Sequence, residues 1–213
     1  TGGNRGIGLA IARRLAAVGD AVTVASRSGD KVDGLATVAC DVRDVASVDE
    51  AFAKAEAEQG PVEVVVANAG ITNDQLLAMM SEDDFTSVLD TNLTGAYRVA
   101  RRAVRPMMRM RRGRLIFISS VVGLLGSGGQ ANYAASKAGL VGLARSLAKA
   151  QRSDGLYNVN LIDPAHFGGP ETSGTAFFAF GLAYGIRAGI IDRATYLPVV
   201  ARAWNGMVAT SVH

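Results

Sequence analysis

The sequence has little of several residue types, and each shortage excludes a class of protein. A single cysteine, Cys40, among 213 residues excludes an intrachain disulfide and fits a reducing cytoplasm. No apolar run reaches the ~18 residues that a membrane helix needs, and no secretory leader opens the sequence. The net charge of +3 is too small to argue for nucleic-acid binding. We therefore expect a cytoplasmic protein that binds neither membranes nor nucleic acids.

The residues that are present indicate a globular chain, long enough for one domain of ordinary size. Hydrophobic residues make up 49% and charged residues 19%, which is a globular rather than a disordered composition. Many of the 25 glycines fall where the backbone must turn tightly or approach a ligand. Cys40 follows an apolar run, which predicts a buried, inert thiol. We predict no metal site.

Over the first 150 residues, short apolar runs alternate with helical patterns. This alternation is typical of βαβ units and predicts a Rossmann-like, doubly wound α/β fold with a parallel sheet. Ser81 and Asp84 have the spacing of a capping box. No strand is recognisable before Thr1. Strands are expected at 20–26, 35–40, 62–68 and 114–119, and helices at 7–18, 45–59, 81–108 and 132–150.

Beyond residue 150 the pattern changes. An alternating run predicts a strand at 156–162, and helices are expected at 172–189 and 195–209. Two consecutive helices with no strand between them favour helix-on-helix packing. We therefore predict two segments, an α/β segment over 1–150 and a helical segment over 151–213.

Three glycines in the first turn, Gly2, Gly6 and Gly8, have the spacing G-x-x-x-G-x-G. Small residues let a backbone approach a pyrophosphate, and the N-terminus of the following helix offers free N–H groups and a partial positive charge. This signal is weak by itself, because glycine turns between a strand and a helix are common.

Other residues along the segment also suggest a dinucleotide site. Arg27 follows the strand at 20–26, where an arginine suits a 2′-phosphate and so indicates NADP. A solvated arginine is the alternative. Arg5 could support the same charge. Asp41 is placed to meet an adenine edge, and 68–70 (Asn-Ala-Gly) end a strand where the cofactor crevice should lie.

The most specific signal consists of Ser120, Tyr133 and Lys137. Tyrosine and lysine four residues apart lie on one helix face. A tyrosine beside a lysine ammonium has a lowered phenol pKa and can exchange a proton near neutrality, while the serine can hold a carbonyl oxygen. A lone Y-x-x-x-K occurs by chance in many helices and usually lies on the surface without a function. Here the glycine turn, Asn92 and Ser120 precede it in the order expected of a reductase site.

These residues give the first 148 positions a family resemblance. Residues 1–148 resemble the short-chain dehydrogenase/reductases, and within them the 3-oxoacyl-[acyl-carrier-protein] reductases. The resemblance implies that Tyr133 is the general acid, that Ser120 orients the carbonyl, that Lys137 holds the nicotinamide ribose and that Asn92 anchors a proton-relaying water. NADP(H) would contact Gly2, Asn4, Arg5, Gly6, Ile7, Gly8, Arg27, Asp41, Asn68, Ala69, Gly70, Tyr133 and Lys137.

The resemblance also implies a reaction and partners. Hydride would pass from NADPH to a 3-oxoacyl thioester to give a 3-hydroxyacyl product, as in fatty acid synthesis. An acidic carrier protein would dock on basic residues, first of all Arg111 and Arg112, although a solvated helix end is the alternative. No aromatic residues interleave these arginines, so nucleic acid is disfavoured. A homo-oligomer built on the helices of Asn92 and Tyr133 is expected.

The tail resembles a different family. Residues 153–213 are similar to the C-terminal part of the unsaturated rhamnogalacturonyl and glucuronyl hydrolases, which would make the chain a chimera. The carrying phrases include 154–157 (Asp-Gly-Leu-Tyr) and 170–176 (Pro-Glu-Thr-Ser-Gly-Thr-Ala). Two alternatives to a working reductase therefore stay open, namely an inactive fusion or fragment and an NADP-binding module without turnover.

Overall fold

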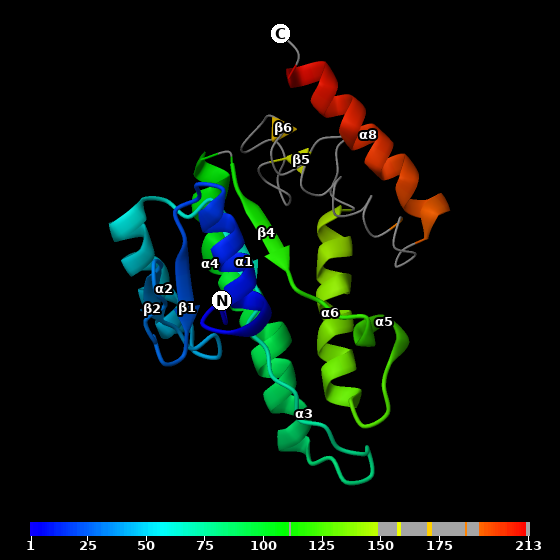
Figure 1. The fold of residues 1–213 in the computed structure, drawn as a ribbon. Coiled ribbons are helices and arrows are strands. Elements are labelled where there is room, and N and C mark those ends of the chain that lie inside the picture. Colours follow the sequence, from blue (N-terminus) through cyan, green and yellow to red (C-terminus); the bar gives the residue numbers. More distant parts are fainter. Residues whose placement is uncertain (111, 149–156, 159–169, 172–185, 187–191, 212–213) are drawn as a thin grey trace. The chain divides into compact units, whose positions relative to one another are not determined.

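The computed structural model describes residues 1–110, 112–148, 157–158, 170–171, 186 and 192–211. The chain divides into two compact units (Figure 1). The first unit comprises Thr1–Pro106 and Leu115–Gly142, and the second comprises Met107–Arg114 and Leu143–His213.

The predicted helices and strands of the first 150 residues are confirmed to within a few residues at their ends. The helices are α1 (Gly6–Ala17), α2 (Val45–Gln59), α3 (Glu82–Leu89), α4 (Gly95–Met110), α5 (Val122–Leu125) and α6 (Ala131–Ala148). The strands are β1 (Thr23–Ser26), β2 (Ala36–Ala39), β3 (Val64–Ala67) and β4 (Arg114–Phe117).

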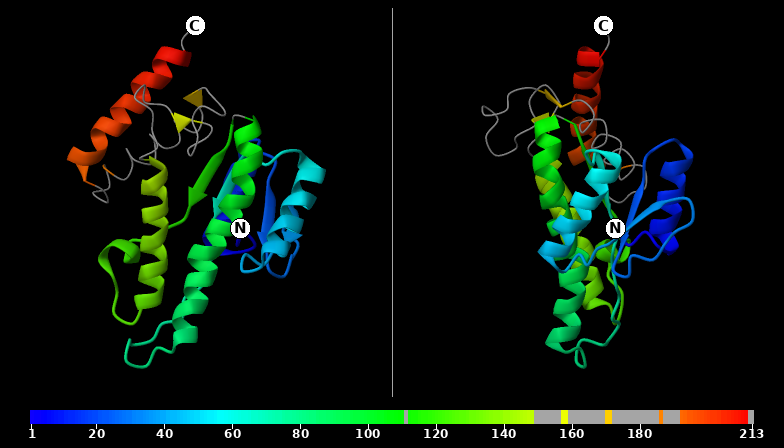
Figure 2. Two further views of the ribbon diagram at one scale, coloured as in Figure 1. Left: turned by 180° about the vertical axis from the view of Figure 1, so that it is seen from behind. Right: turned by 90° about the vertical axis from the view of Figure 1, so that its left-hand side faces the viewer.

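These four strands form two separate pairs rather than one continuous sheet. β1 and β2 are parallel, with Thr23 opposite Ala36, and β3 pairs with β4. α1 and α2 lie on opposite sides of the β1–β2 pair (Figure 2). Residues of both β1 and β3 line a cavity of about 370 Å³, and within the described residues these two strands do not pair with each other.

Two apolar clusters hold these pairs against their helices. Ala12 of α1 packs with Val24 of β1. Ala67 of β3 packs with Ala96 of α4 and Leu140 of α6. Cys40 is buried as predicted, with 5% of its surface exposed, and burial raises the pKa of its thiol.

The long helix predicted at 81–108 is interrupted by a π-helical turn. The predicted capping box is present, because the Ser81 hydroxyl accepts from the Asp84 N–H and the Asp84 carboxylate accepts from the Ser81 N–H. Between α3 and α4, the chain makes a π-helix, η1 (Asp90–Thr94). Its one wider turn places Asn92 in the interior, with 1% of its surface exposed.

In the second unit, α8 (Arg193–Ser211) covers the helix predicted at 195–209. β5 (Tyr157–Asn158) lies within the predicted strand at 156–162 and pairs antiparallel with β6 (Pro170–Glu171), which was not predicted. Most of the helix predicted at 172–189 lies outside the described residues. Among the helices that the structure describes, none has the length and apolar character to cross a membrane.

Candidate functional site

The glycine turn is held between β1 and β3 by its own backbone. Gly2 N–H donates to the Ala25 carbonyl at 2.8 Å. The Asn68 amide donates to the carbonyls of Thr1 and Gly2, both at 3.1 Å. The Thr1 hydroxyl accepts from the N–H groups of Asn68 and Ala69. The structure thus brings two predicted cofactor elements, the turn and the end of β3, into direct contact.

Gly8 makes the turn tight enough for this arrangement. A Cβ on Gly8 would lie 2.2 Å from the Gly2 carbonyl oxygen and 2.5 Å from the Asn68 amide nitrogen. The first bond of α1 runs from the Leu9 N–H to the Arg5 carbonyl, and the Arg5 side chain does not cap the helix. The first N–H groups of α1 therefore remain available to an anion, which fits a pyrophosphate.

The end of β1 carries two features that fit the other end of a dinucleotide. The Ser26 hydroxyl oxygen is buried and has no hydrogen-bond partner within the described residues. Arg27 is exposed. The Asn4 amide lies within 3.5 Å of the Asp30 carboxylate on the neighbouring loop. A buried unpaired hydroxyl beside an exposed guanidinium suits a polar, anionic group such as a phosphorylated ribose.

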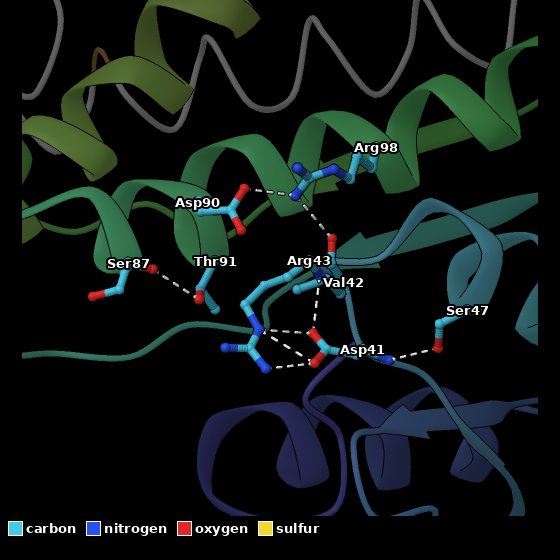
Figure 3. A network of polar contacts seen from close by, with 8 residues as sticks. All are labelled: Asp41, Val42, Arg43, Ser47, Ser87, Asp90, Thr91 and Arg98. Carbon is cyan, nitrogen blue, oxygen red and sulfur yellow. Dashed lines mark hydrogen bonds and ion pairs between the residues drawn. The ribbon is translucent and has the colours of Figure 1, made fainter. Parts of the chain in front are cut away.

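Asp41 is engaged by a close neighbour (Figure 3). Its carboxylate accepts from the Arg43 side chain, with the shortest contact at 2.6 Å, and this pairing lowers the pKa of Asp41 to about 2. Its backbone N–H donates to the Ser47 hydroxyl at 2.9 Å. The predicted contact of Asp41 with an adenine stays a prediction.

The same network accounts for part of the arginine cluster. Arg98 donates to the Asp90 carboxylate at 2.8 Å and reaches the Val42 carbonyl at 3.4 Å (Figure 3). Arg102 pairs with Glu56 at 2.7 Å. These two arginines therefore tie α4 to the rest of the first unit. Of the predicted carrier-binding pair, Arg111 lies outside the described residues and Arg112 is exposed.

Asn92 joins the loop after β3 to α6. Its carbonyl oxygen accepts from the Ile71 N–H at 2.8 Å. Its amide nitrogen donates to the Ile71 carbonyl at 2.9 Å and to the Ser136 hydroxyl at 3.1 Å. Gly70 lies between Asn92 and Lys137, since a Cβ there would be 3.1 Å from the Asn92 oxygen and 3.6 Å from the Lys137 nitrogen.

Lys137 and Tyr133 meet on one face of α6, as their spacing predicts. The Lys137 ammonium lies 5.6 Å from the centre of the Tyr133 ring and donates to the Ile118 carbonyl at 2.8 Å. Only 4% of the surface of Lys137 is exposed, and desolvation lowers its pKa. The Tyr133 side chain is half-buried. This arrangement places a cation beside a phenol.

The segment that carries Ser120 is fastened to the same helix. The Ser119 hydroxyl donates to the Lys137 carbonyl at 2.8 Å. A Cβ on Gly123 would lie 2.8 Å from the Ala138 nitrogen, so α5 approaches α6 closely. The Ser120 hydroxyl accepts from the Val122 N–H at 3.2 Å and keeps its own proton to donate.

Two buried residues of the site were missed from the sequence. Asn132 and Ser136 each have 0% of their surface exposed. The Ser136 hydroxyl donates to the Tyr133 carbonyl at 2.8 Å, and the Asn132 side-chain oxygen accepts from the Tyr133 N–H at 2.7 Å. The available signal was their position, Asn132 directly before Tyr133 and Ser136 directly before Lys137, since polar residues at a buried helix face require partners.

Comparison with known proteins gives the same direction as the geometry. The family model for short chain dehydrogenase matches residues 1–175. This match continues past the predicted junction near residue 150. The predicted resemblance of 153–213 to sugar hydrolases is not shown by any of these matches and stays a prediction.

Individual relatives carry more specific names. The chain is 53% identical over 166 residues to the 3-oxoacyl-[acyl-carrier-protein] reductase MabA of Mycobacterium avium, covering 78% of this chain and 65% of that protein. It is 54% identical to MabA of Mycobacterium tuberculosis H37Rv, with 78% and 67% covered. It is 44% identical to FabG of Escherichia coli K12, with 77% and 70% covered.

The chain thus spans about two thirds of the length of the curated relatives that it matches. The matched part contains the glycine turn, the end of β3, the π-helical turn and the Tyr–Lys face of α6. On the extent of this match, the chain belongs to the short-chain dehydrogenase family.

Proposed function

We propose that the chain is an NADPH-dependent carbonyl reductase that acts on 3-oxoacyl thioesters. The observation that carries the proposal is the placement of Lys137. Its ammonium is buried, anchored to the Ile118 carbonyl at the end of β4, and 5.6 Å from the Tyr133 ring. An ammonium held this close to a phenol can stabilise the negative charge that remains on the phenol oxygen after it gives up its proton.

The cofactor is NADP(H), and the residues present fit it. The free N–H groups at the start of α1 would bind its pyrophosphate, and Arg27 with Ser26 would bind its phosphorylated ribose. A Cβ on Gly70 would lie 3.1 Å from the Asn92 oxygen and 3.6 Å from the nitrogen of Lys137, the residue that would hold the nicotinamide ribose. When bound, NADPH supplies the hydride.

The residues of the chain supply the proton and the orientation. The Ser120 hydroxyl donates a hydrogen bond to the substrate carbonyl oxygen, and the Tyr133 hydroxyl donates its proton to that oxygen as it gains charge. The Lys137 ammonium stabilises the phenolate that remains. The buried Asn92 binds the N–H and the carbonyl of Ile71, the residue after Gly70, and so fixes the backbone at this point of the site.

The substrate class follows from the relatives, whose names describe them as 3-oxoacyl-[acyl-carrier-protein] reductases. An acyl chain delivered on an acidic carrier would meet exposed arginines of α4, and Arg101 and Arg105 are both exposed. Arg112 remains the predicted contact beyond the end of α4. Assembly of copies through α4 and α6 also stays a prediction.

A spectrophotometric assay tests the proposed function. Oxidation of NADPH is followed at fixed enzyme concentration with a 3-oxoacyl thioester, with the matching 3-oxo acid, and with a saturated thioester. We expect turnover with the first, weaker turnover with the second and none with the third, because only the first two contain the reducible carbonyl. Failure of all three to consume NADPH, in a folded sample, would contradict the proposal.

Arg27 should decide between the two nicotinamide dinucleotides. Replacement of Arg27 by glutamate removes the partner of the 2′-phosphate and adds repulsion, so the kcat/KM ratio of NADPH to NADH should fall about 100-fold. Arg13→Glu, an exposed arginine on α1, is the matched control and should leave the ratio unchanged. If the Arg27 variant kept the original ratio of kcat/KM values, Arg27 would not be part of the cofactor site.

The alternative of an NADP-binding module without turnover predicts cofactor binding with no oxidation of NADPH in the same assay. The predicted alternative of an inactive fusion predicts neither. The intact set of Asn92, Ser120, Tyr133 and Lys137, in the contacts described above, favours turnover. We assign no separate activity to residues 176–213, which lie beyond the family match.

A further inference from the structure

The hydroxyl of Tyr133, proposed above as the proton donor, is not held by any hydrogen bond to the part of the chain that the structure describes. Within the described residues, the Tyr133 hydroxyl makes no hydrogen bond, and its half-buried ring rests near Lys137. The position of that hydroxyl therefore depends on where the backbone of Tyr133 is held. A displacement of about 1 Å at a reacting group can reduce a rate about 100-fold.

The backbone of Tyr133 is gripped on both sides by buried side chains. Its N–H donates to the Asn132 side-chain oxygen at 2.7 Å, and its carbonyl accepts from the Ser136 hydroxyl at 2.8 Å. The Ser136 hydroxyl in turn accepts from Asn92 at 3.1 Å. All three side chains are buried, with at most 1% of their surface exposed. Buried polar groups of this kind are costly to leave unpaired, so the grip is rigid.

Asn132 connects this grip to two other elements. Its amide nitrogen donates to the Asn73 carbonyl at 2.8 Å, in the loop after β3, and to the Asp84 carbonyl at 3.0 Å, in α3. The three hydrogen bonds that the structure describes for the Asn132 side chain thus all go to backbone groups. The first turn of α6 is fixed against α3 and the loop at the residue next to Tyr133.

The same loop is also bound to the two residues just before α6. The Gln130 amide donates to the Asp74 carboxylate at 2.9 Å, and the Gln75 N–H donates to the Gly129 carbonyl at 2.8 Å. The Asn73 side chain donates to the Asp84 carboxylate at 2.6 Å without contacting Asn132 through its own amide. Asn73 and Asn132 thus belong to one network, but only Asn132 contacts Tyr133.

We propose that Asn132 and Ser136 are positioning residues that hold the Tyr133 hydroxyl in register with the substrate carbonyl, acting through the Tyr133 backbone. This inference rests on the proposed reductase function for its kinetic consequences. Its structural part, the fixed position of the Tyr133 ring, does not depend on turnover.

The test compares Asn132→Ala with Asn73→Ala, the same chemical change in the same network. For Asn132→Ala we expect kcat to fall about 100-fold while the Kd for NADPH stays within about twofold, because the dinucleotide contacts do not involve Asn132. The solvent deuterium effect on kcat should increase, since proton transfer from Tyr133 becomes slower. Asn73→Ala should keep kcat and the isotope effect within about twofold.

A second variant covers the case in which Asn132→Ala does not fold. Ser136→Ala removes the other half of the grip and leaves a good helix former, so it should fold and show the same split between kcat and Kd. Equal losses in kcat for the Asn132 and Asn73 variants, or a lowered kcat with no change in the isotope effect for Ser136→Ala, would overturn the proposal.

A spectroscopic readout separates this proposal from the reductase function itself. In chain labelled with ¹³C at the tyrosine rings, the Tyr133 resonance is assigned from its loss in Tyr133→Phe. It should shift or broaden in Asn132→Ala and Ser136→Ala and stay in place in Asn73→Ala, whether or not the chain turns over. An unshifted resonance in the first two variants would show that neither residue positions Tyr133.

Discussion

Replacement of Tyr133 by phenylalanine should reduce kcat for 3-oxoacyl thioester reduction by about 10²–10⁴-fold, the usual contribution of a positioned general acid. The substitution removes only the hydroxyl, and this hydroxyl makes no hydrogen bond within the described residues, so the fold loses no contact. The ring stays near Lys137. We therefore expect an unchanged melting temperature and a Kd for NADPH within about twofold of the original.

Tyr97→Phe is the matched control for this result. Tyr97 lies in α4 with 49% of its surface exposed and is not among the site residues. Its variant should keep full activity. If Tyr133→Phe retained more than about a tenth of the original kcat, another group would be the proton donor and the assignment of Tyr133 would be wrong.

Replacement of Gly8 by alanine should have the largest effect on the fold and on cofactor binding together. The new methyl group would lie 2.2 Å from the Gly2 carbonyl oxygen, and that oxygen is held by the Asn68 amide at 3.1 Å. Neither the Gly2 carbonyl nor the Asn68 amide is free to move away from the new methyl group, so the glycine turn must open. We expect a loss of about 1–3 kcal/mol in the free energy of unfolding, typical of overpacking.

Opening the turn would also displace the N–H groups that face the pyrophosphate, so the affinity for NADPH should fall at least about tenfold. Gly142→Ala supplies the control, since a Cβ there meets nothing within 4 Å and alanine favours a helix. That variant should be as stable as the original or slightly more so. Urea unfolding and a fluorescence titration measure both quantities, and unchanged values for Gly8→Ala would show that the turn does not form as described.

The parts of the site that one element carries could be predicted from the sequence. Tyr133 and Lys137 lie one helical turn apart, so their spacing alone places them on the same face of α6. The capping box at Ser81 is likewise a local pattern. In each case the residues that interact lie within four positions of one another, and the helix geometry does the rest.

Contacts between elements could not be predicted in this way. Asn92 reaches Ser136 only because the helix around it widens into a π-helical turn, and no local pattern indicated that turn. The pairing of Arg102 with Glu56 likewise depends on how α4 packs beside α2.

The most direct test of the proposed reductase function is whether this chain transfers hydride from NADPH to the substrate carbonyl. The chain is incubated with NADPH carrying deuterium at the transferable position of C4 and with a 3-oxoacyl thioester, and the product is analysed by mass spectrometry. We predict a 3-hydroxyacyl thioester with one deuterium on C3, formed by the original chain and at least about 100-fold more slowly by Tyr133→Phe. Unreduced thioester recovered from folded chain that binds NADPH would contradict the account and leave a cofactor-binding protein without turnover.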